Sequence, residues 1–244
     1  MSDSTEAFVL VHGAHHGKWV WDSIVPYLEL PAVALDLPGR GVPDDLRSLT
    51  IADCAENLIA QMRDARLRRV TLVGHSLAGS VAWTAAAMAP DLVVGLVGIA
   101  AVFPPPGKRV TDLWPTGLRW LPRAMLAARR GGPNEPLSLS ERNARRRLTN
   151  DLDSERASWL IARLGPEAVG LSTSRVPQLQ LSPALYRGYV LCLRDRALAP
   201  ARQRVQASQI NAPIVEIPTG HDPMVSAPAV LARVLNDVVA GWVR

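Results

Sequence analysis

Six short runs of apolar and often β-branched residues recur along the chain, each followed within a few positions by glycine, proline or aspartate. They are Ala7–Val11, Ala32–Leu35, Val70–Val73, Leu96–Val102, Tyr189–Leu193 and Ile214–Ile217. Apolar residues at helical spacing fill Ile51–Arg66, Leu77–Ala89 and Pro228–Val243. Near-continuous apolar strands that alternate with helices predict an α/β fold with a doubly wound, mostly parallel sheet covered on both faces.

A long segment between the fourth and fifth apolar runs departs from this alternation. Residues 104–183 open with a proline run and contain helix-like stretches, but they hold no convincing central strand. An insertion of this length inside one α/β domain predicts a helical cap over the active edge of the sheet. We expect a single domain, with residues 1–103 and 184–244 as the core and residues 104–183 as the cap.

Positive charge is concentrated in the predicted cap. The whole sequence has 27 Lys and Arg against 22 Asp and Glu, a net charge of +5, and residues 104–183 hold Lys108 and twelve arginines against seven acids. Such a segment is either a solvated face or a surface for an anionic substrate or an acidic carrier protein. No nucleic-acid-binding motif accompanies it, so no nucleic-acid partner is expected.

The remaining composition is that of an ordinary globular protein, with 48% hydrophobic and 20% charged residues. The polar, acidic start MSDSTEAF does not read as a signal peptide, and the longest apolar stretch, Leu92–Phe103, is too short to span a bilayer. Cys54 and Cys192 suggest neither a disulfide nor a zinc site. We expect a cytoplasmic protein without a membrane segment, either a monomer or a dimer.

The third apolar run leads directly into a serine flanked by small residues, in VTLVGHSLAG. A strand, this turn and a following helix are typical of a nucleophile elbow, which presents the serine hydroxyl above the carboxyl edge of the sheet. Gly74 and Ala78 are small enough for such a turn, although Ala78 stands where the commonest pattern has glycine. The simpler alternative is that Ser76 only caps a helix or forms a turn.

A serine nucleophile needs a base and an acid that orients the base. His221 follows the last apolar run, in PTGHDPM, and it is the only histidine on the C-terminal side of Ser76. Asp195 follows the preceding run, so the order Ser76, Asp195, His221 matches that of strand-end triads in such sheets. The alternatives are a turn histidine and a surface acid paired with Arg194 or Arg196.

The loop after the first strand reads LVHGAHHGKWVW and lies at the same edge of the predicted sheet. The N–H of Ala14, beside the close-approaching Gly13, and the N–H of Leu77 are the expected donors to an oxyanion.

With these residues identified, the chain resembles the α/β-hydrolases over nearly its whole length. The stretches HGAHHGKWVW, ALDLPGRG, VTLVGHSLAG, NDLDSERASWLIARLGPE, YVLCLRDRALAP and GHDPMVSAP are similar to the small esterases of the plant methylesterase and hydroxynitrile lyase group and their bacterial relatives. The resemblance implies an α/β-hydrolase fold and a Ser-His-Asp triad of Ser76, His221 and Asp195, with Ala14 and Leu77 as oxyanion donors. It implies hydrolysis of a small ester or thioester through an acyl-serine, without a metal or organic cofactor.

Two positions separate this chain from the lyases that it resembles. Those lyases carry threonine where this chain has Gly13, and lysine where Asp222 follows the predicted catalytic histidine. Both differences favour ester hydrolysis over cyanohydrin cleavage.

The residues of a substrate pocket are harder to predict than the triad. Phe103 leaves the fourth apolar run beside the site, and Trp114 and Trp120 lie in the cap, where they either shape an apolar pocket or hold the cap to the core. His15 and His75 are further candidates for the pocket, as is Gly13.

Three other functions fit the same residues. One is a lyase, cyclase or cofactor-free oxygenase, because fold does not fix reaction. Another is a small-ligand receptor in which turnover is incidental. The third is a biosynthetic thioesterase that acts on a carrier protein, for which the basic cap is the only indication.

Overall fold

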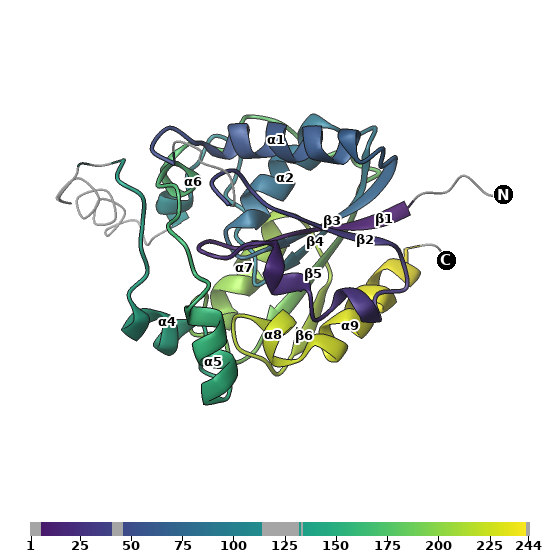
Figure 1. Cartoon of the computed structure of the whole chain (residues 1–244). Coiled ribbons are helices and arrows are strands. Elements are labelled where there is room, and N and C mark those ends of the chain that lie inside the picture. Colours follow the sequence, from purple (N-terminus) through teal and green to yellow (C-terminus); the bar gives the residue numbers. More distant parts are fainter. Residues whose placement is uncertain (1–5, 41–45, 114–131, 133, 243–244) are drawn as a thin grey trace.

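The computed structural model describes residues 6–40, 46–113, 132 and 134–242, and its centre is a six-stranded sheet (Figure 1). The strands lie in the order β2-β1-β3-β4-β5-β6, and every neighbouring pair is parallel. The strands are β1 Glu6–Val11, β2 Ala32–Leu35, β3 Arg69–His75, β4 Val93–Ile99, β5 Tyr186–Cys192 and β6 Ile214–Ile217. The predicted parallel α/β sheet is therefore confirmed.

The predicted boundaries of the fourth strand were wrong. That strand was expected over Leu96–Val102, but β4 ends at Ile99, because Ala100 has a φ of 45° and turns the chain out of the sheet. Ala100, Ala101 and Phe103 are nevertheless buried, and the N–H of half-buried Val102 donates to the carbonyl of Ser76 at 2.9 Å. The apolar run thus continues past the strand into a buried turn, which hydrophobic pattern alone does not distinguish from strand.

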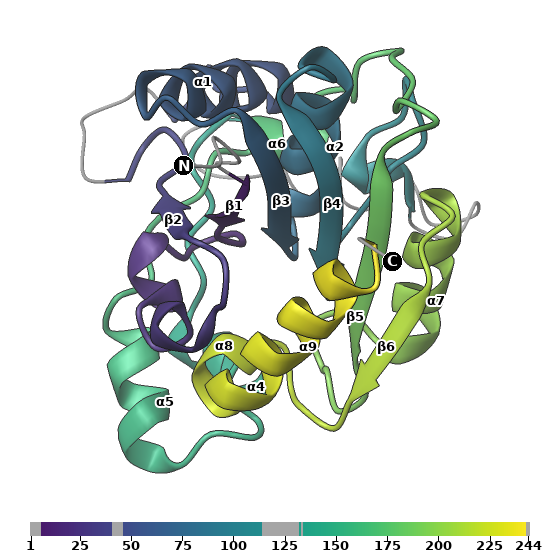
Figure 2. The ribbon, with the colours of Figure 1, turned by 90° about the vertical axis from the view of Figure 1, so that its right-hand side faces the viewer.

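Helices cover the two faces of the sheet (Figure 2). The apolar residues on one face pack with α1 (Ile51–Asp64), α2 (Ala78–Met88) and α7 (Pro200–Gln209). Those on the other face pack with the short helices η1 (Lys18–Trp21) and η2 (Val25–Tyr27), with α8 (Pro223–Ser226) and with α9 (Pro228–Ala240). Because both faces are covered, the residues that leave the strand ends meet at the carboxyl edge of the sheet.

The chain between β4 and β5 contributes no strand to this sheet in its described part. It contains η3 (Val110–Leu113), α4 (Glu141–Arg147), α5 (Ser154–Ile161) and α6 (Gly170–Thr173), and an isolated antiparallel bridge joins Leu137 to Glu167. Trp114 and Trp120, the aromatic residues predicted for the cap, lie outside the described residues. Among the described helices, none is both long and apolar enough to cross a bilayer.

Helix α1 begins where the sequence provides a complete cap. The Thr50 hydroxyl accepts from the N–H of Asp53 at 3.3 Å, and the Asp53 carboxylate accepts from the N–H of Thr50 at 2.9 Å. Each N–H would otherwise lack an intrahelical partner. The buried face of the helix (Ile51, Cys54, Ala55, Leu58, Ile59 and Met62) then packs on the sheet.

We expect Thr50→Ala to lower the free energy of unfolding by about 1 kcal/mol, the usual cost of removing a side-chain N-cap. Urea denaturation followed by circular dichroism measures the change. Thr50→Ser keeps the hydroxyl and should stay close to the parent. Equal losses in both variants would contradict the cap.

Candidate active site

Ser76 lies in a tight turn between β3 and α2. Its φ is 52°, in the left-handed region that non-glycine residues rarely occupy. The turn is held by main-chain bonds, because the N–H of Ser76 donates to Ile99 O at 3.0 Å and Ser76 O accepts from the N–H of Gly79 at 3.1 Å. A Cβ at Gly74 would lie 3.0 Å from the carbonyl oxygen of Ala78, which explains the small residue there. Strand, turn and helix thus have the arrangement of a nucleophile elbow.

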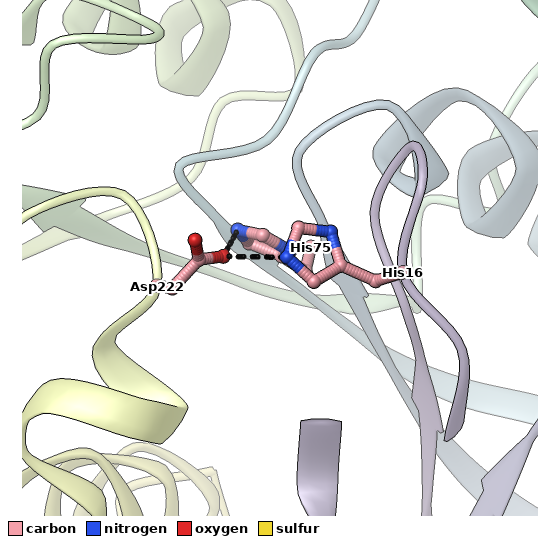
Figure 3. A group of neighbouring side chains, drawn as sticks. All are labelled: His16, His75 and Asp222. Carbon is pink, nitrogen blue, oxygen red and sulfur yellow. Dashed lines mark ion pairs between the residues drawn. The ribbon is translucent and has the colours of Figure 1, made fainter. Parts of the chain in front are cut away.

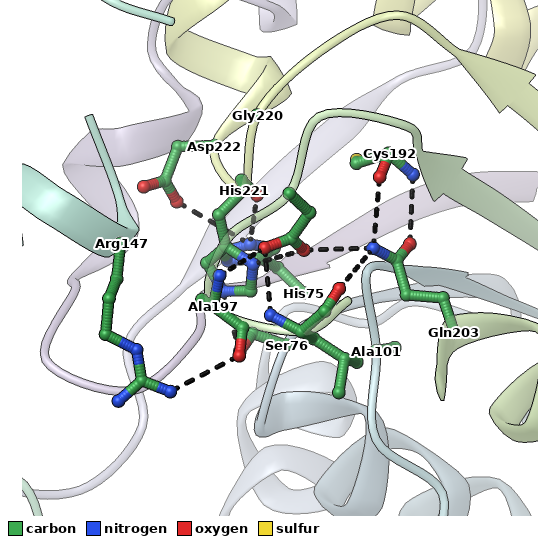
Figure 4. Close-up of polar contacts among 12 residues, drawn as sticks. His75, Ser76, Ala101, Arg147, Cys192, Ala197, Gln203, Gly220, His221 and Asp222 are labelled. Carbon is green, nitrogen blue, oxygen red and sulfur yellow. Dashed lines mark hydrogen bonds and ion pairs between the residues drawn. The ribbon is translucent and has the colours of Figure 1, made fainter. Parts of the chain in front are cut away.

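The structure brings the three predicted triad residues together, and Figure 4 labels two of them, Ser76 and His221. Ser76 Oγ lies 3.0 Å from His221 Nε2, and His221 Nδ1 lies 2.7 Å from Asp195 Oδ2. Asp195 comes from the loop after β5 and His221 from the loop after β6, so all three meet at the carboxyl edge of the sheet. In the neutral ring that fits these contacts, Nδ1 donates to the carboxylate and Nε2 accepts from the hydroxyl.

The carboxylate of Asp195 is fixed by donors on both oxygens. Oδ1 accepts from the N–H of Ala197 at 2.6 Å and of Leu198 at 2.9 Å, and Oδ2 accepts from Gln203 Nε2 at 3.0 Å as well as from His221. Gln203 lies on α7 and also bonds the main chain of Cys192 at both its N–H and its carbonyl. The sequence analysis did not identify Gln203. The sequence feature that could have identified it is its helical spacing with Gln206 and Ala207, which are buried on the same face of α7.

Opposing effects act on the pKa of His221. Burial by itself lowers the pKa of His221, but the charge and hydrogen bond of Asp195, together with the charge of Asp222, outweigh burial and raise it above 6.5. The nearby guanidinium of Arg147 acts in the lowering direction. Arg147 lies on α4 and donates to Ala197 O at 3.3 Å, within the same loop that holds Asp195 (Figure 4).

The loop after β1 lies against the serine. A Cβ at Gly13 would come within 2.7 Å of His75 Nδ1 and 3.0 Å of Ser76 Cβ, so only glycine permits this approach without a shift. Within the described part of the chain, the N–H groups of Ala14 and Leu77 donate to no protein acceptor. Both N–H groups are therefore unoccupied by acceptors of the described chain, and their role as oxyanion donors stays a prediction.

Two of the histidines in this loop hold the main chain. His12 donates from Nδ1 to Gly13 O at 2.9 Å and accepts at Nε2 from the N–H of Leu37 at 3.1 Å, a pairing that suits the neutral ring. Burial lowers the pKa of His12 to about 3. His15 has a φ of 67°, and its Nδ1 lies 3.0 Å from Gly165 O. Burial also lowers the pKa of His15, and a pocket role for this residue stays a prediction.

A second buried polar group lies next to the triad (Figure 3). It consists of His16, His75 and Asp222, whose nearest nitrogen and oxygen atoms lie within 4.8 Å of one another. The residue types would suit a metal ion, but His75 Nε2 already donates to His221 O at 2.9 Å. The sequence analysis had considered His75 only for the pocket and Asp222 only as a departure from the lyases.

Phe103 lies in the hydrophobic core. It is buried, its ring packs edge-on against Tyr189 at 6.3 Å, and its N–H donates to Gln206 Oε1. It also lines a cavity of about 350 Å³ together with Trp83 and Arg187, and none of the triad residues lines that cavity. The contacts of Phe103 are those of a packing residue, and its role in a substrate pocket stays a prediction.

Comparisons with known proteins agree with this geometry. The profile described as "Alpha/beta hydrolase family" matches residues 8–234. Salicylic acid-binding protein 2 of Nicotiana tabacum is 28% identical over 225 residues, covering 84% of this chain and 85% of its own. Methyl jasmonate esterase 1 of Vitis vinifera is 26% identical over 267 residues, covering 96% and 97%.

Among solved structures, an extracellular alpha/beta-hydrolase from a Paenibacillus species superposes with a TM-score of 0.81 at 20% identity, covering 95% of this chain and 98% of that one. At this identity the likeness establishes the fold alone.

We expect Gln203→Met to lower the free energy of unfolding by roughly 2 kcal/mol, because it leaves the buried N–H of Cys192 without an acceptor. Urea denaturation measures the loss. Gln209→Met, at an exposed position of the same helix, is the matched control and should change stability little. Equal losses of stability in the two variants would show that the hydrogen bonds of Gln203 do not cause the loss.

Proposed function

The chain belongs to the alpha/beta hydrolase family, and we propose that it hydrolyses a small carboxylic ester or thioester through an acyl-serine intermediate. Ser76 is the nucleophile, His221 the base and Asp195 the acid that orients it. The observation that carries the proposal is the continuous contact from Ser76 Oγ to His221 Nε2 at 3.0 Å and from His221 Nδ1 to Asp195 at 2.7 Å.

The proposed reaction is acyl transfer in two halves. His221 removes the proton from Ser76 as Oγ attacks the ester carbonyl, and the oxyanion forms beside the N–H groups of Ala14 and Leu77. The imidazolium, stabilised by Asp195, then protonates the leaving alkoxide or thiolate, so that the acyl group stays on Ser76. Water attacks the acyl-serine by the same route, releases the acid and restores the hydroxyl.

The relatives support an ester as the substrate class. One full-length match is named a methyl jasmonate esterase, and such a substrate is a small carboxylic ester. A match of similar extent is named for binding salicylic acid, which keeps a ligand-binding role as the second candidate. Turnover separates the two, because a receptor would bind a small acid without acylating Ser76.

The first test is a fluorophosphonate label combined with hydrolysis of short nitrophenyl esters, on the parent and on Ser76→Ala. The parent should gain the mass of one label, and the variant should lose both labelling and turnover, with kcat lower by about 10³-fold or more. Intact-protein mass spectrometry and absorbance measure the two. A folded parent that neither labels nor turns over would refute the proposal and leave the receptor role.

The pH profile gives a second test. His221 accepts a proton only when neutral, so kcat/KM should fall as the pH drops through its raised pKa, with a midpoint above 6.5. Removing a positive charge in Arg147→Gln should raise that pKa further and move the acid limb to higher pH. Arg142→Gln removes the same charge from the same short helix and serves as the control. Equal limbs in all three proteins would contradict the assignment of His221.

A further inference from the structure

The buried group beside the triad leaves one carboxylate without a hydrogen bond. Asp222 is fully buried, and neither of its oxygens has a hydrogen-bond partner. Its Oδ1 lies 3.4 Å from His16 Nε2 and 3.6 Å from His75 Nε2. An isolated charge at such a position is strongly unfavourable, so a positive partner must be close.

Two of the three neighbouring histidines are already committed elsewhere. His75 donates from Nε2 to His221 O, while its Nδ1 has no partner, as expected of a neutral ring. Burial lowers the pKa of His75 to about 3, in agreement with that form. The ring of His221 is occupied by Asp195 on one side and Ser76 on the other.

His16 is the neighbour whose two ring nitrogens both face oxygen acceptors. Nδ1 lies 2.8 Å from the carbonyl oxygen of Ala14, and Nε2 faces Asp222. In a neutral ring the single N–H is taken by the carbonyl of Ala14, and the lone pair of Nε2 then faces the carboxylate. The imidazolium instead places a positive charge 3.4 Å from Asp222 Oδ1, although Nε2 makes no hydrogen bond in this geometry. Burial alone would raise the pKa of Asp222, but His16, then His75 and His221, outweigh it and hold that pKa at about 2, so the carboxylate is charged.

We infer that His16 and Asp222 form a buried ion pair that positions the oxyanion loop against the histidine loop during acyl transfer. The inference rests on the proposed function, and it makes both residues positioning residues that do not touch the substrate. His16 holds the carbonyl of Ala14, the predicted oxyanion donor, and Asp222 directly follows His221.

His75 completes the connection between the loops. It directly precedes Ser76 and donates to the carbonyl of His221. His75 therefore links the nucleophile to the base, and it lies in one contact group with His16 and Asp222 (Figure 3). A donor displaced from the developing oxyanion loses transition-state stabilisation, and small errors of placement are costly to rate. The pair therefore acts on kcat more than on substrate binding.

The main test is a double-mutant cycle with Asp222→Asn, His16→Gln and the double variant, assayed on the same nitrophenyl ester. Each single variant should lose about tenfold to a hundredfold in kcat with KM changed by less than about threefold. The kcat of the double variant should be only slightly below that of the slower single variant, because the two residues act as a unit. Losses that multiply, or a kcat unchanged in folded Asp222→Asn, would overturn the inference.

The acid limb of the pH profile supplies a readout that packing alone would not move. Asp195, Asp222 and Arg147 act on the pKa of His221, and Asp222 raises it. The ring centre of His75 lies 4.8 Å from that of His221, but the His75 ring is neutral, because burial lowers the pKa of His75 to about 3. In Asp222→Asn the limb should therefore move to lower pH, opposite to its movement in Arg147→Gln. Leu58→Ala in α1 is the control for lost stability: it should lower Tm while kcat and the limb stay near those of the parent.

A measurement on the parent protein tests the inference even if the variants do not fold. With histidine-selective ¹⁵N labelling at the pH of the assay, one of the five imidazoles should carry slowly exchanging protons on both nitrogens. Five neutral rings would overturn the inference. So would activity that is lost to a chelator and restored by Zn²⁺, because a metal would then replace the proton. A parent that neither labels nor hydrolyses ester refutes the proposed function itself, whereas an active parent with unaffected variants refutes the ion pair alone.

Discussion

The turn at Ser76 is the constraint on which the rest of the site depends. With φ at 52°, the residue is kept in an unfavourable conformation by bonds to β4 and the chain that follows it, from Ser76 N–H to Ile99 O and from Val102 N–H to Ser76 O. A Cβ at Gly79 would lie 2.9 Å from both Ala101 Cβ and Val102 O, so α2 packs directly on that turn. The buried end of β4 thus fixes the position of the Ser76 hydroxyl. The loops that carry Asp195 and His221 approach this fixed hydroxyl.

Two carboxylates flank His221, and the structure gives them different surroundings. Asp195 accepts hydrogen bonds on both oxygens and faces the ring nitrogen opposite the hydroxyl, as an orienting acid must. Asp222 has no hydrogen-bond partner and faces histidines instead. Both charges raise the pKa of His221, yet only the first can select its tautomer. Asp195 therefore supplies both charge and orientation to His221, whereas Asp222 supplies charge alone.

Much of the fold and the positions of the triad could be predicted from the sequence, because buried parallel strands are continuous apolar runs and their carboxyl ends share one edge. The end of β4 could not, because residues 100–103 are equally apolar but turn away. Gln203 was missed because its value lies in a side-chain contact with Asp195, in the loop just before α7, which helical spacing alone does not reveal. The role of His16 was missed for the same reason: adjacent histidines in one loop differ only in what they face.

The chain between β4 and β5 is bound to the catalytic loops by two of its acids. Glu167 accepts from the N–H of His15 at 3.0 Å and from Arg40 at 2.7 Å, and Asp151 accepts from the N–H of Gly220, directly before His221. The bonds to His15 and Gly220 each fix a backbone N–H next to a residue of the proposed mechanism. A change in this segment that moved either acid would move the oxyanion loop or the base with it. The position of this segment and the geometry of the two loops are therefore coupled, and a substitution in it should be assessed together with its effect on kcat.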